Sequence, residues 1–448
     1  MVVAVMVKAY ALGVPIIVAV FVALLSQFVD SGWAADGQTW RYVSELSEEE
    51  RSVIDLRAET PRDPTVPYLP AEPYPFSPPY TAEEMGLLSA EFSHMPRWNC
   101  ALIEAYGSVV PSGYLVIGKS IGLVLYPSSP GLAGQLTTKP GEWYTRFLFQ
   151  AIAPPEEHGR QSLYTLYRTD QQFTTKTDLF AYSPHLRRVR RQPQPRRQDT
   201  SPGFAGTFDD FLNRDAWEFS WRLVGMDVLY ETVRFPRTRT SITLTSSDGT
   251  LSEVSPQELR LMGKEYPDYT PEGGVKCYVV EARAREEWIP GYYAPKILYW
   301  LDHRTFFPLR IEQYDASGTL IYVEARIARL FNPELGKQGY TTHIFVQWDV
   351  PTDLLSFDVH DAYQARQWSA NDREVFFSPD FMRRVWFVAP LKSQAEVPRP
   401  EEFFLRPHLH REKFPQERQL QLPPQVEARV RAQEKAGRLV FEEGQNSR

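Results

Sequence analysis

The chain has 448 residues and a formal net charge of −7, with 43% hydrophobic and 13% aromatic residues. The acidic balance argues against a nucleic-acid-binding protein, and two cysteines exclude a disulfide-dense scaffold. The length is sufficient for two ordinary domains or one large sheet protein.

The N-terminal segment has the three-part layout of a secretory signal. Lys8 precedes an apolar run from Ala9 to Val29, and small residues follow, with Ala34 as the expected cleavage site. We therefore expect residues 1–34 to be a signal peptide, with a retained membrane anchor as the alternative, because the run approaches the roughly 20 residues that span a bilayer. An exported and otherwise soluble chain is not expected to bind nucleic acid.

Residues 35–97 predict two short helices joined by an extended segment. Ser47 with Glu50, and Thr81 with Glu84, each form a capping-box pattern before an apolar run. Between them, 61–79 holds eight prolines in nineteen residues, which excludes a helix or a central strand. We expect this segment to lie extended over the surface.

Residues 98–390 predict an antiparallel β-sheet domain, because apolar residues alternate with polar ones and strands follow one another through short turns. Tight turns are expected at 302–305 and 315–318, and a helix is expected to begin after Ser378 with Pro379 at its first position. Residues 391–448 mix both charge signs with proline, and we expect a disordered tail with a weak helix at 426–440.

Large aromatic residues are concentrated in the predicted strands. They offer more flat apolar area than a two-layer core requires, and we consider two interpretations: ordinary core packing, or an apolar face that binds an acyl chain. The predicted ligand-binding residues are Trp217, Phe219, Trp221, Tyr299 and Trp300.

The stretch from Ser183 to Arg197 contains six arginines. Guanidinium groups bind phosphate and carboxylate groups in a bidentate manner, so Arg187, Arg188, Arg190 and Arg191 are candidates to hold the headgroup of an anionic lipid. The alternative is an edge strand whose arginines pair with nearby acids such as Asp209 and Asp210.

No other chemistry is indicated by a motif. Cys100 and Cys277 allow one disulfide or two unpaired buried thiols, and the sequence leaves both open. The tightest histidine groupings, at 358–361 and 408–410, lack zinc-site spacing, so we expect no metal and no cofactor. We find no nucleophile elbow and no phosphate-binding loop, and we expect a protein that is not an enzyme.

The order of several segments resembles a known family. "YSPHLRRVRR", "GTFDDFLNRDAWEFSWRLVG", "KCYVVEAR" and "APKILYWLDHRTFFPLRIEQYDASGTL" are similar to an uncharacterised family of exported Gram-negative proteins, domain of unknown function 1329, over roughly residues 70–390. The family is often labelled "outer membrane lipoprotein-sorting protein".

The resemblance implies a fold like that of the periplasmic lipoprotein carrier. This is a mainly β (α+β) architecture: a large curved antiparallel half-barrel with a few helices on its concave face and an apolar cavity between them. It also implies a periplasmic location, and as partners a lipid or acylated protein, an exporter of the resistance–nodulation–division type and an outer-membrane protein. We therefore expect a carrier of lipid or lipid-modified cargo, with an adaptor between exporter and outer membrane as the alternative and an envelope hydrolase as the third.

Overall fold

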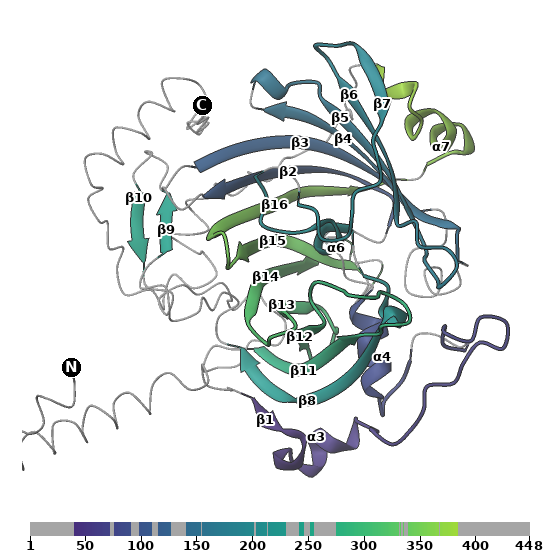
Figure 1. Cartoon of the computed structure of the whole chain (residues 1–448), viewed down its shortest axis with the longest axis vertical. Helices are drawn as coiled ribbons and strands as arrows, with labels where there is room; N and C mark the ends of the chain where they lie inside the picture. The colour runs from purple at the N-terminus through teal and green to yellow at the C-terminus, as the bar shows by residue number, and fades with distance from the viewer. Residues whose placement is uncertain are drawn as a thin grey trace, which may run out of the picture.

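The computed structural model describes the sheet domain and the helices around it (Figure 1). None of the described helices has the length and hydrophobicity that a membrane span requires. The described residues are 40–71, 76–90, 98–109, 115–126, 140–153, 155–200, 203–212, 214–229, 242–245, 251–254, 275–330, 332, 335, 339–366 and 368–383.

Fourteen strands form one open antiparallel sheet, and two further strands form a separate hairpin. The order in the large sheet is β1-β8-β11-β12-β13-β14-β15-β16-β2-β3-β4-β5-β6-β7. The strands are β1 (Arg41–Tyr42), β2 (Cys100–Val109), β3 (Leu115–Leu125), β4 (Trp143–Ala153), β5 (Gln161–Tyr167), β6 (Thr177–Ser183), β7 (Arg188–Arg191), β8 (Phe219–Leu229), β9 (Ile242–Thr245), β10 (Leu251–Val254), β11 (Val275–Ala284), β12 (Lys296–Asp302), β13 (Pro308–Tyr314), β14 (Leu320–Leu330), β15 (Tyr340–Asp349) and β16 (Leu354–Ala365).

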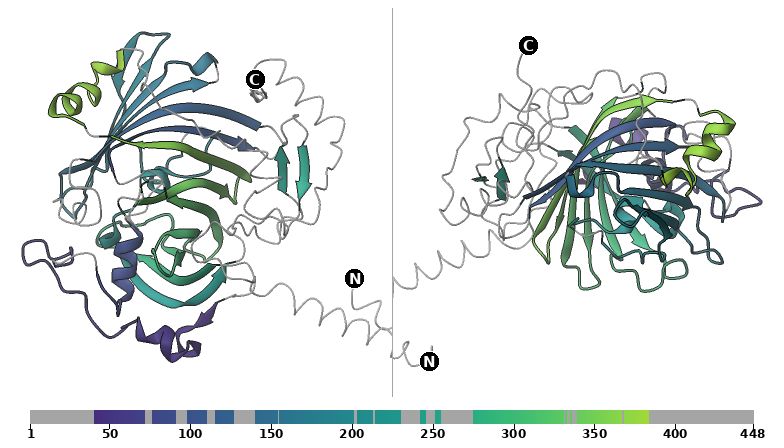
Figure 2. Two further views of the ribbon diagram at one scale, coloured as in Figure 1. Left: turned by 180° about the vertical axis from the view of Figure 1, so that it is seen from behind. Right: turned by 90° about the horizontal axis from the view of Figure 1, so that it is seen from above.

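The predicted fold class is confirmed, because the sheet is antiparallel, strongly curved and not closed (Figures 1 and 2). Strands β12, β13 and β14 follow one another in sequence and pair as antiparallel neighbours, with one register shift in each pair, as the predicted turns require. Asp302 accepts a hydrogen bond from the backbone N–H of Thr305, and Asp315 accepts one from that of Ser317. These Asx-type contacts explain why both turns could be recognised in the sequence.

Two helices pack on the concave face of the sheet. Helix α4 (Ala82–Ser89) contacts β8 and β11, and α6 (Phe208–Leu212) lies in front of β15 and β16 (Figure 1). Helix α7 (Ala370–Phe376) and the 3₁₀ helix η6 (Phe381–Arg383) lie on the other face, where Phe377 and Met382 join the apolar side chains of β2 to β5. Each face of the sheet is therefore covered over part of its area.

Helix starts follow the sequence signals closely. Helix α3 (Glu48–Ser52) and helix α4 begin at the predicted capping boxes of Ser47 and Thr81. Of the helix predicted after Ser378, the structure describes residues up to 383, and these form the 3₁₀ turn η6; Ser378 Oγ accepts the backbone N–H of Phe381 at 3.3 Å. Helix α7 was not predicted, although Ser369 and Asp372 form its capping box. The other 3₁₀ helices within the described residues are η1 (Val43–Glu45), η2 (Pro155–Glu157) and η3 (Ala216–Glu218).

The N-terminal segment joins the sheet domain directly. Strand β1 pairs with β8, and Leu46 lies in the same core cluster as Met85 of α4. The predicted signal peptide at 1–34, the tail at 391–448 and its helix at 426–440 lie outside the described residues.

Gly86 allows α4 to approach the sheet, and its replacement gives a direct test of this packing. A Cβ at Gly86 would overlap the indole of Trp221. Gly86→Ala should therefore lower the free energy of unfolding by about 1–2 kcal/mol, because overpacking outweighs the helix propensity of alanine. Urea unfolding checks this, and the added substitution Trp221→Leu should recover part of the loss; a raised midpoint for Gly86→Ala alone would contradict it.

Candidate functional site

Residues 203–218, with 213 outside the described residues, cross the concave face, and we call them the plug. At its start, the backbone N–H of Ala205 donates to Ser356 Oγ at 3.0 Å, on β16. Thr207 then caps α6, and its backbone N–H donates to Asp210 Oδ2 at 2.8 Å. The plug ends in η3, immediately before β8. It therefore bridges the two halves of the curved sheet.

A cavity of about 250 Å³ lies between the plug and strands β2 to β5, β15 and β16. Its walls are mainly aromatic: Phe208 and Phe211 of α6 face Phe149 and Tyr164 of the sheet, with ring centroids of Tyr164 and Phe211 6.1 Å apart. The aromatic residues that line it are Tyr106, Phe149, Tyr164, Phe204, Phe208, Phe211 and Phe345. Such walls favour an apolar ligand.

An exposed arginine lies at the solvent side of this cavity, next to a loop that the basic β6–β7 turn contacts. Arg160 lines the cavity, yet its side chain is 58% exposed and pairs with Glu157 at 2.9 Å. The turn that precedes β7 packs on the same loop, because His185 Nε2 lies 3.3 Å from the carbonyl oxygen of Glu156. Positive charge is thus available where the head of an anionic ligand would meet water.

The buried end of the cavity is polar. Glu104 and Asp358 line it, and His360 Nε2 lies 3.5 Å from Glu104 Oε2 and 3.3 Å from Asp358 Oδ1. Burial and the nearby Asp358 carboxylate raise the pKa of Glu104 above its ordinary value. Burial opposes the charging of His360, but Asp358 and Glu104 outweigh it and raise the pKa of the imidazole.

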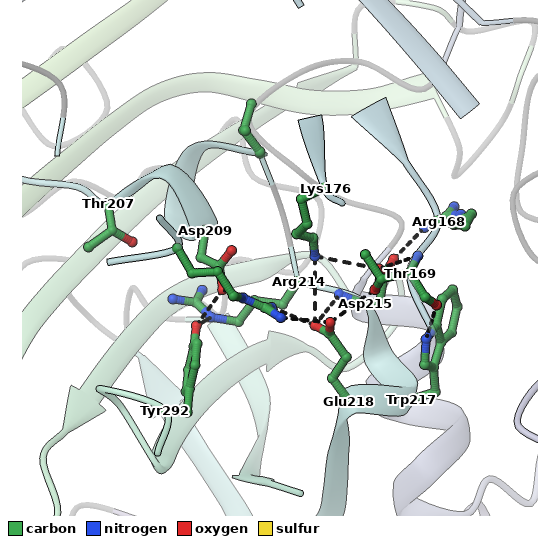
Figure 3. Close-up of polar contacts among 12 residues, drawn as sticks. Arg168, Thr169, Lys176, Thr207, Asp209, Arg214, Asp215, Trp217, Glu218 and Tyr292 are labelled. Atoms are coloured by element: carbon green, nitrogen blue, oxygen red, sulfur yellow. Dashed lines mark hydrogen bonds and ion pairs between the residues drawn. The ribbon is translucent and has the colours of Figure 1, made fainter. Parts of the chain in front are cut away.

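A buried network of charges anchors the C-terminal half of the plug (Figure 3). The Glu218 carboxylate accepts hydrogen bonds from both terminal nitrogens of Arg197, at 2.8 and 2.6 Å. Lys176 Nζ lies 3.6 Å from the same carboxylate. Asp215 pairs with Arg168 at 2.9 Å and lies 3.5 Å from Lys176 Nζ. These contacts tie η3 to the end of β5 and the start of β6.

The same network continues through α6 to the loop before β12. Arg197 Nε also donates to Asp209 Oδ2 at 2.6 Å, and Tyr292 donates its hydroxyl to that oxygen at 2.7 Å (Figure 3). Arg214 pairs with Asp210 at 2.5 Å and donates to the Tyr292 hydroxyl at 2.8 Å. Four cations and four carboxylates are therefore paired within the network, which fixes the position of the plug.

The network should make the protein sensitive to acid. Burial alone would raise the pKa of Glu218, but Lys176 and Arg197 outweigh it and lower that pKa from 4.5 to about 2. Because the folded pKa is depressed, this stabilisation is present above pH 4.5 and is lost as the pH falls toward 2. The melting temperature should fall across this window, and Glu218→Gln should flatten the fall; parallel curves for the two proteins would contradict the assignment.

The structure places the predicted aromatic residues in packed clusters. Phe219, Trp221 and Tyr299 share the α4 side, with the Trp221 and Tyr299 centroids 5.5 Å apart. Trp300, the neighbour of Tyr299 in β12, points to the opposite face, where its Nε1 donates to Asp227 at 2.9 Å. Trp217 lies in η3 and donates to the carbonyl of Thr169 at 3.1 Å. None of the five is among the described residues that line the cavity, and their part in ligand binding stays a prediction.

The predicted arginine cluster lies on the last strand of the sheet. Arg188, Arg190 and Arg191 are exposed residues of β7, whereas Arg187 has a left-handed φ of 50° in the turn before it and does not belong to the strand. Arg191 pairs with Asp178 at 2.7 Å. The acids named as possible partners, Asp209 and Asp210, instead pair with Arg197 and Arg214.

Because Arg188 and Arg190 are exposed, their replacement can distinguish headgroup binding from a structural role in the edge strand. Because exposed charges contribute about 0–1 kcal/mol, the double variant Arg188→Gln/Arg190→Gln should keep its melting temperature within about 2 °C. Differential scanning calorimetry measures this. A larger loss would assign the pair a structural role at the edge of the sheet.

The two cysteines are not joined in the structure. Cys100 lies on β2 in the α6-side cluster, and Cys277 lies on β11 in the cluster of the opposite face, where its Sγ donates to the carbonyl of Val275 at 3.4 Å. Six strand spacings separate β11 from β2, a path of about 29 Å along the curved sheet at the usual strand spacing, and the two thiols lie on opposite faces. The disulfide alternative is therefore wrong, and burial raises the pKa of the Cys100 thiol.

Comparison with known proteins agrees with the resemblance seen in the sequence. A family described as a protein of unknown function (DUF1329) matches residues 73–383. The chain belongs to this family. The matched region of this DUF1329 protein includes α4, the whole plug and every strand that lines the cavity.

Three solved structures are similar to this DUF1329 protein. A DUF1329 family protein from Desulfovibrio piger is 11% identical, with 65% of this chain and 95% of that chain covered, at a TM-score of 0.44. An outer membrane lipoprotein-sorting domain from Vibrio parahaemolyticus is 12% identical, with coverage of 68% and 98% and a TM-score of 0.44. A LolA superfamily protein from Nitrosomonas europaea is 14% identical, with coverage of 67% and 99% and a TM-score of 0.38. No curated protein matches the chain.

The cavity residues were not selected from the sequence. Phe208 and Phe211 stand in "GTFDDFLN", which contributed to the resemblance but carries no binding motif. Asp358 and His360 were noticed as one of two tight histidine groupings, whereas Glu104, directly opposite His360 across the strand pair, lies 256 residues earlier. Only the register of β16 on β2 brings the three together.

Proposed function

We propose that this protein is a non-catalytic periplasmic carrier that binds an anionic amphiphile with one short acyl chain, either a free lipid or the acyl group of a lipid-modified protein. The observation that carries the proposal is the aromatic-walled cavity with Arg160 at its solvent side. At about 250 Å³, the cavity is smaller than the roughly 300–1,000 Å³ of most small-molecule sites, so one short chain suits it better than a multi-chain lipid.

The expected affinity follows from the area that the chain buries. Each buried methylene contributes about 0.8 kcal/mol, so about eight methylenes contribute about 6 kcal/mol. Arg160 then holds the carboxylate or phosphate at the surface. These contributions together correspond to micromolar binding, which suits a carrier that must release its cargo.

Native mass spectrometry tests the proposal on protein purified from a Gram-negative periplasm without detergent. We expect an added mass that disappears on delipidation, and that mass distinguishes a free lipid from an acylated protein. A ligand-free mass at every gentle setting, together with no uptake of a fluorescent fatty acid, would overturn the proposal. An exporter of the resistance–nodulation–division type and an outer-membrane protein stay predictions as partners.

A further inference from the structure

Three side chains with metal-ligating atoms meet at the buried end of the cavity. Asp358 and His360 are two residues apart on β16 and therefore point to the same face. His360 is paired directly with Glu104 of β2 in the sheet register. One ligand atom from each of the three lies within 4.8 Å of the others, and all three residues are buried.

The separations between these atoms suit a tetrahedral ion. Zn²⁺ bonds to imidazole nitrogen and carboxylate oxygen at roughly 2.0–2.1 Å, which makes the edge of a regular tetrahedron about 3.3–3.4 Å. His360 Nε2 lies 3.3 Å from Asp358 Oδ1 and 3.5 Å from Glu104 Oε2. In two of the three ligand pairs, the two ligand atoms are therefore already separated by about the edge length of this tetrahedron.

Outer contacts hold the three side chains in this arrangement. Ser120 donates its hydroxyl to Glu104 Oε1, which leaves Oε2 directed at His360. The imidazole hydrogen-bonds the backbone of Thr342 and packs edge-on against Phe345, with centroids 5.7 Å apart. Metal-bound histidines characteristically use their other ring nitrogen in this way, because it fixes the tautomer and the ring orientation.

The charge balance of the cluster points to a cation. Two carboxylates are buried beside one imidazole, and Glu104 Oε2 accepts no hydrogen bond from any residue that the structure describes. A divalent ion at this position would give Glu104 Oε2 a partner and would offset the negative charge of both carboxylates.

We propose that Glu104, Asp358 and His360 bind one divalent cation of the zinc class, with a fourth coordination position open to the cavity. The carboxylates alone would also suit Ca²⁺ or Mg²⁺, but those ions take oxygen ligands, so the imidazole nitrogen of His360 favours Zn²⁺ and its neighbours. Because Glu104 and Asp358 line the cavity, the fourth position is reachable by water or by an oxygen of the bound molecule. The metal site shares this cavity with the proposed cargo site, but it rests on its own three ligands and does not depend on which cargo is carried.

Metal titration of the full chain tests the site. After treatment with EDTA and dialysis, the protein is titrated with Zn²⁺ by isothermal titration calorimetry and with Co²⁺ by visible absorption spectroscopy. We expect one ion per chain, a tetrahedral Co²⁺ spectrum, and a rise in melting temperature with Zn²⁺. Loss of an outer-shell partner alone costs roughly 10–100-fold in affinity, so His360→Gln and Glu104→Gln should each weaken binding by at least about 100-fold.

The remaining histidine grouping supplies the matched control. The double variant His408→Gln/His410→Gln should bind Zn²⁺ with unchanged affinity, which excludes "HLH" as the source of the signal. Glu104→Gln keeps the shape of the side chain and tests the site where His360→Gln does not fold. No saturable binding to the unmodified chain, or equal binding by the control and both cluster variants, would overturn the proposal. Neither result bears on cargo binding, which is read separately by mass spectrometry.

Discussion

Replacing Glu218 with glutamine should lower the free energy of unfolding by about 3–5 kcal/mol, the usual cost of breaking a buried ion pair. The side chain is buried and accepts both terminal nitrogens of Arg197. The amide is nearly isosteric, so the loss arises from charge: Arg197 and Lys176 lose an anion in a place where water does not replace it. Urea unfolding at pH 7 measures the change.

Glu281 offers a matched control on the neighbouring strand β11. It also pairs with arginines, at 3.1 Å to Arg222 and 2.9 Å to Arg283, but both partners are more than half exposed. The Glu281 carboxylate is itself buried, but water screens both exposed guanidinium groups, so Glu281→Gln should cost less than Glu218→Gln. Equal losses for Glu218→Gln and Glu281→Gln would mean that the network at the plug contributes no more than a surface pair.

The sheet could be predicted because its information is local. The alternation of apolar and polar residues in a strand, and the Asp residue that begins a turn, are each visible within a few consecutive residues. The strands β12, β13 and β14 and the turns between them could therefore be predicted directly. The capping boxes at Ser47 and Thr81 are equally local, and both begin helices where expected. Curvature and the concave placement of helices came only with the family resemblance.

The cavity could not be predicted because it depends on pairings between distant segments. Strand β16 pairs with β2, which places Asp358 and His360 beside Glu104. The plug then brings Phe208 and Phe211 over Phe149 and Tyr164. Neither the β16–β2 pairing nor the packing of the plug on the sheet can be recognised from the spacing of residues in the sequence. The most conspicuous aromatic residues, by contrast, are core: Phe219, Trp221 and Tyr299 pack beneath α4, and Trp300 packs on the opposite face of the sheet.

The clustering of arginines in the sequence was a poor guide to the buried ion pairs for a similar reason. The arginine cluster at 187–191 is conspicuous in the sequence because its members are adjacent, and adjacency in an edge strand leaves them exposed. Arg168 and Arg214 are buried and paired, yet each stands alone in the sequence. The buried partner of Arg168 is Asp215, 47 residues further along the chain, so no local cluster in the sequence marks this pair.

Filling the cavity should abolish the proposed ligand binding without unfolding the protein. Ser162 lies on β5, is half-buried and lines the cavity between Phe149 and Tyr164 on neighbouring positions of the sheet. Ser162→Trp places an indole in a space of about 250 Å³, which leaves no room for an acyl chain that contributes about 0.8 kcal/mol per methylene. Loss of about eight methylenes of burial corresponds to more than a 100-fold loss of affinity for a fluorescent fatty acid.

Ser220→Trp is the control for this change. Ser220 is exposed on β8, so the same substitution there leaves the cavity intact and should leave fatty-acid affinity unchanged. Circular dichroism of both variants shows whether the sheet is retained. If Ser162→Trp keeps its fold and still binds the fatty acid as tightly as Ser220→Trp does, the ligand lies elsewhere. The strands on the α4 side would then be the next place to test, because Trp221 and Tyr299 line a second, smaller cavity of about 30 Å³ there. That space is too small for an acyl chain unless α4 moves, so binding at this place would require the helix to leave the sheet.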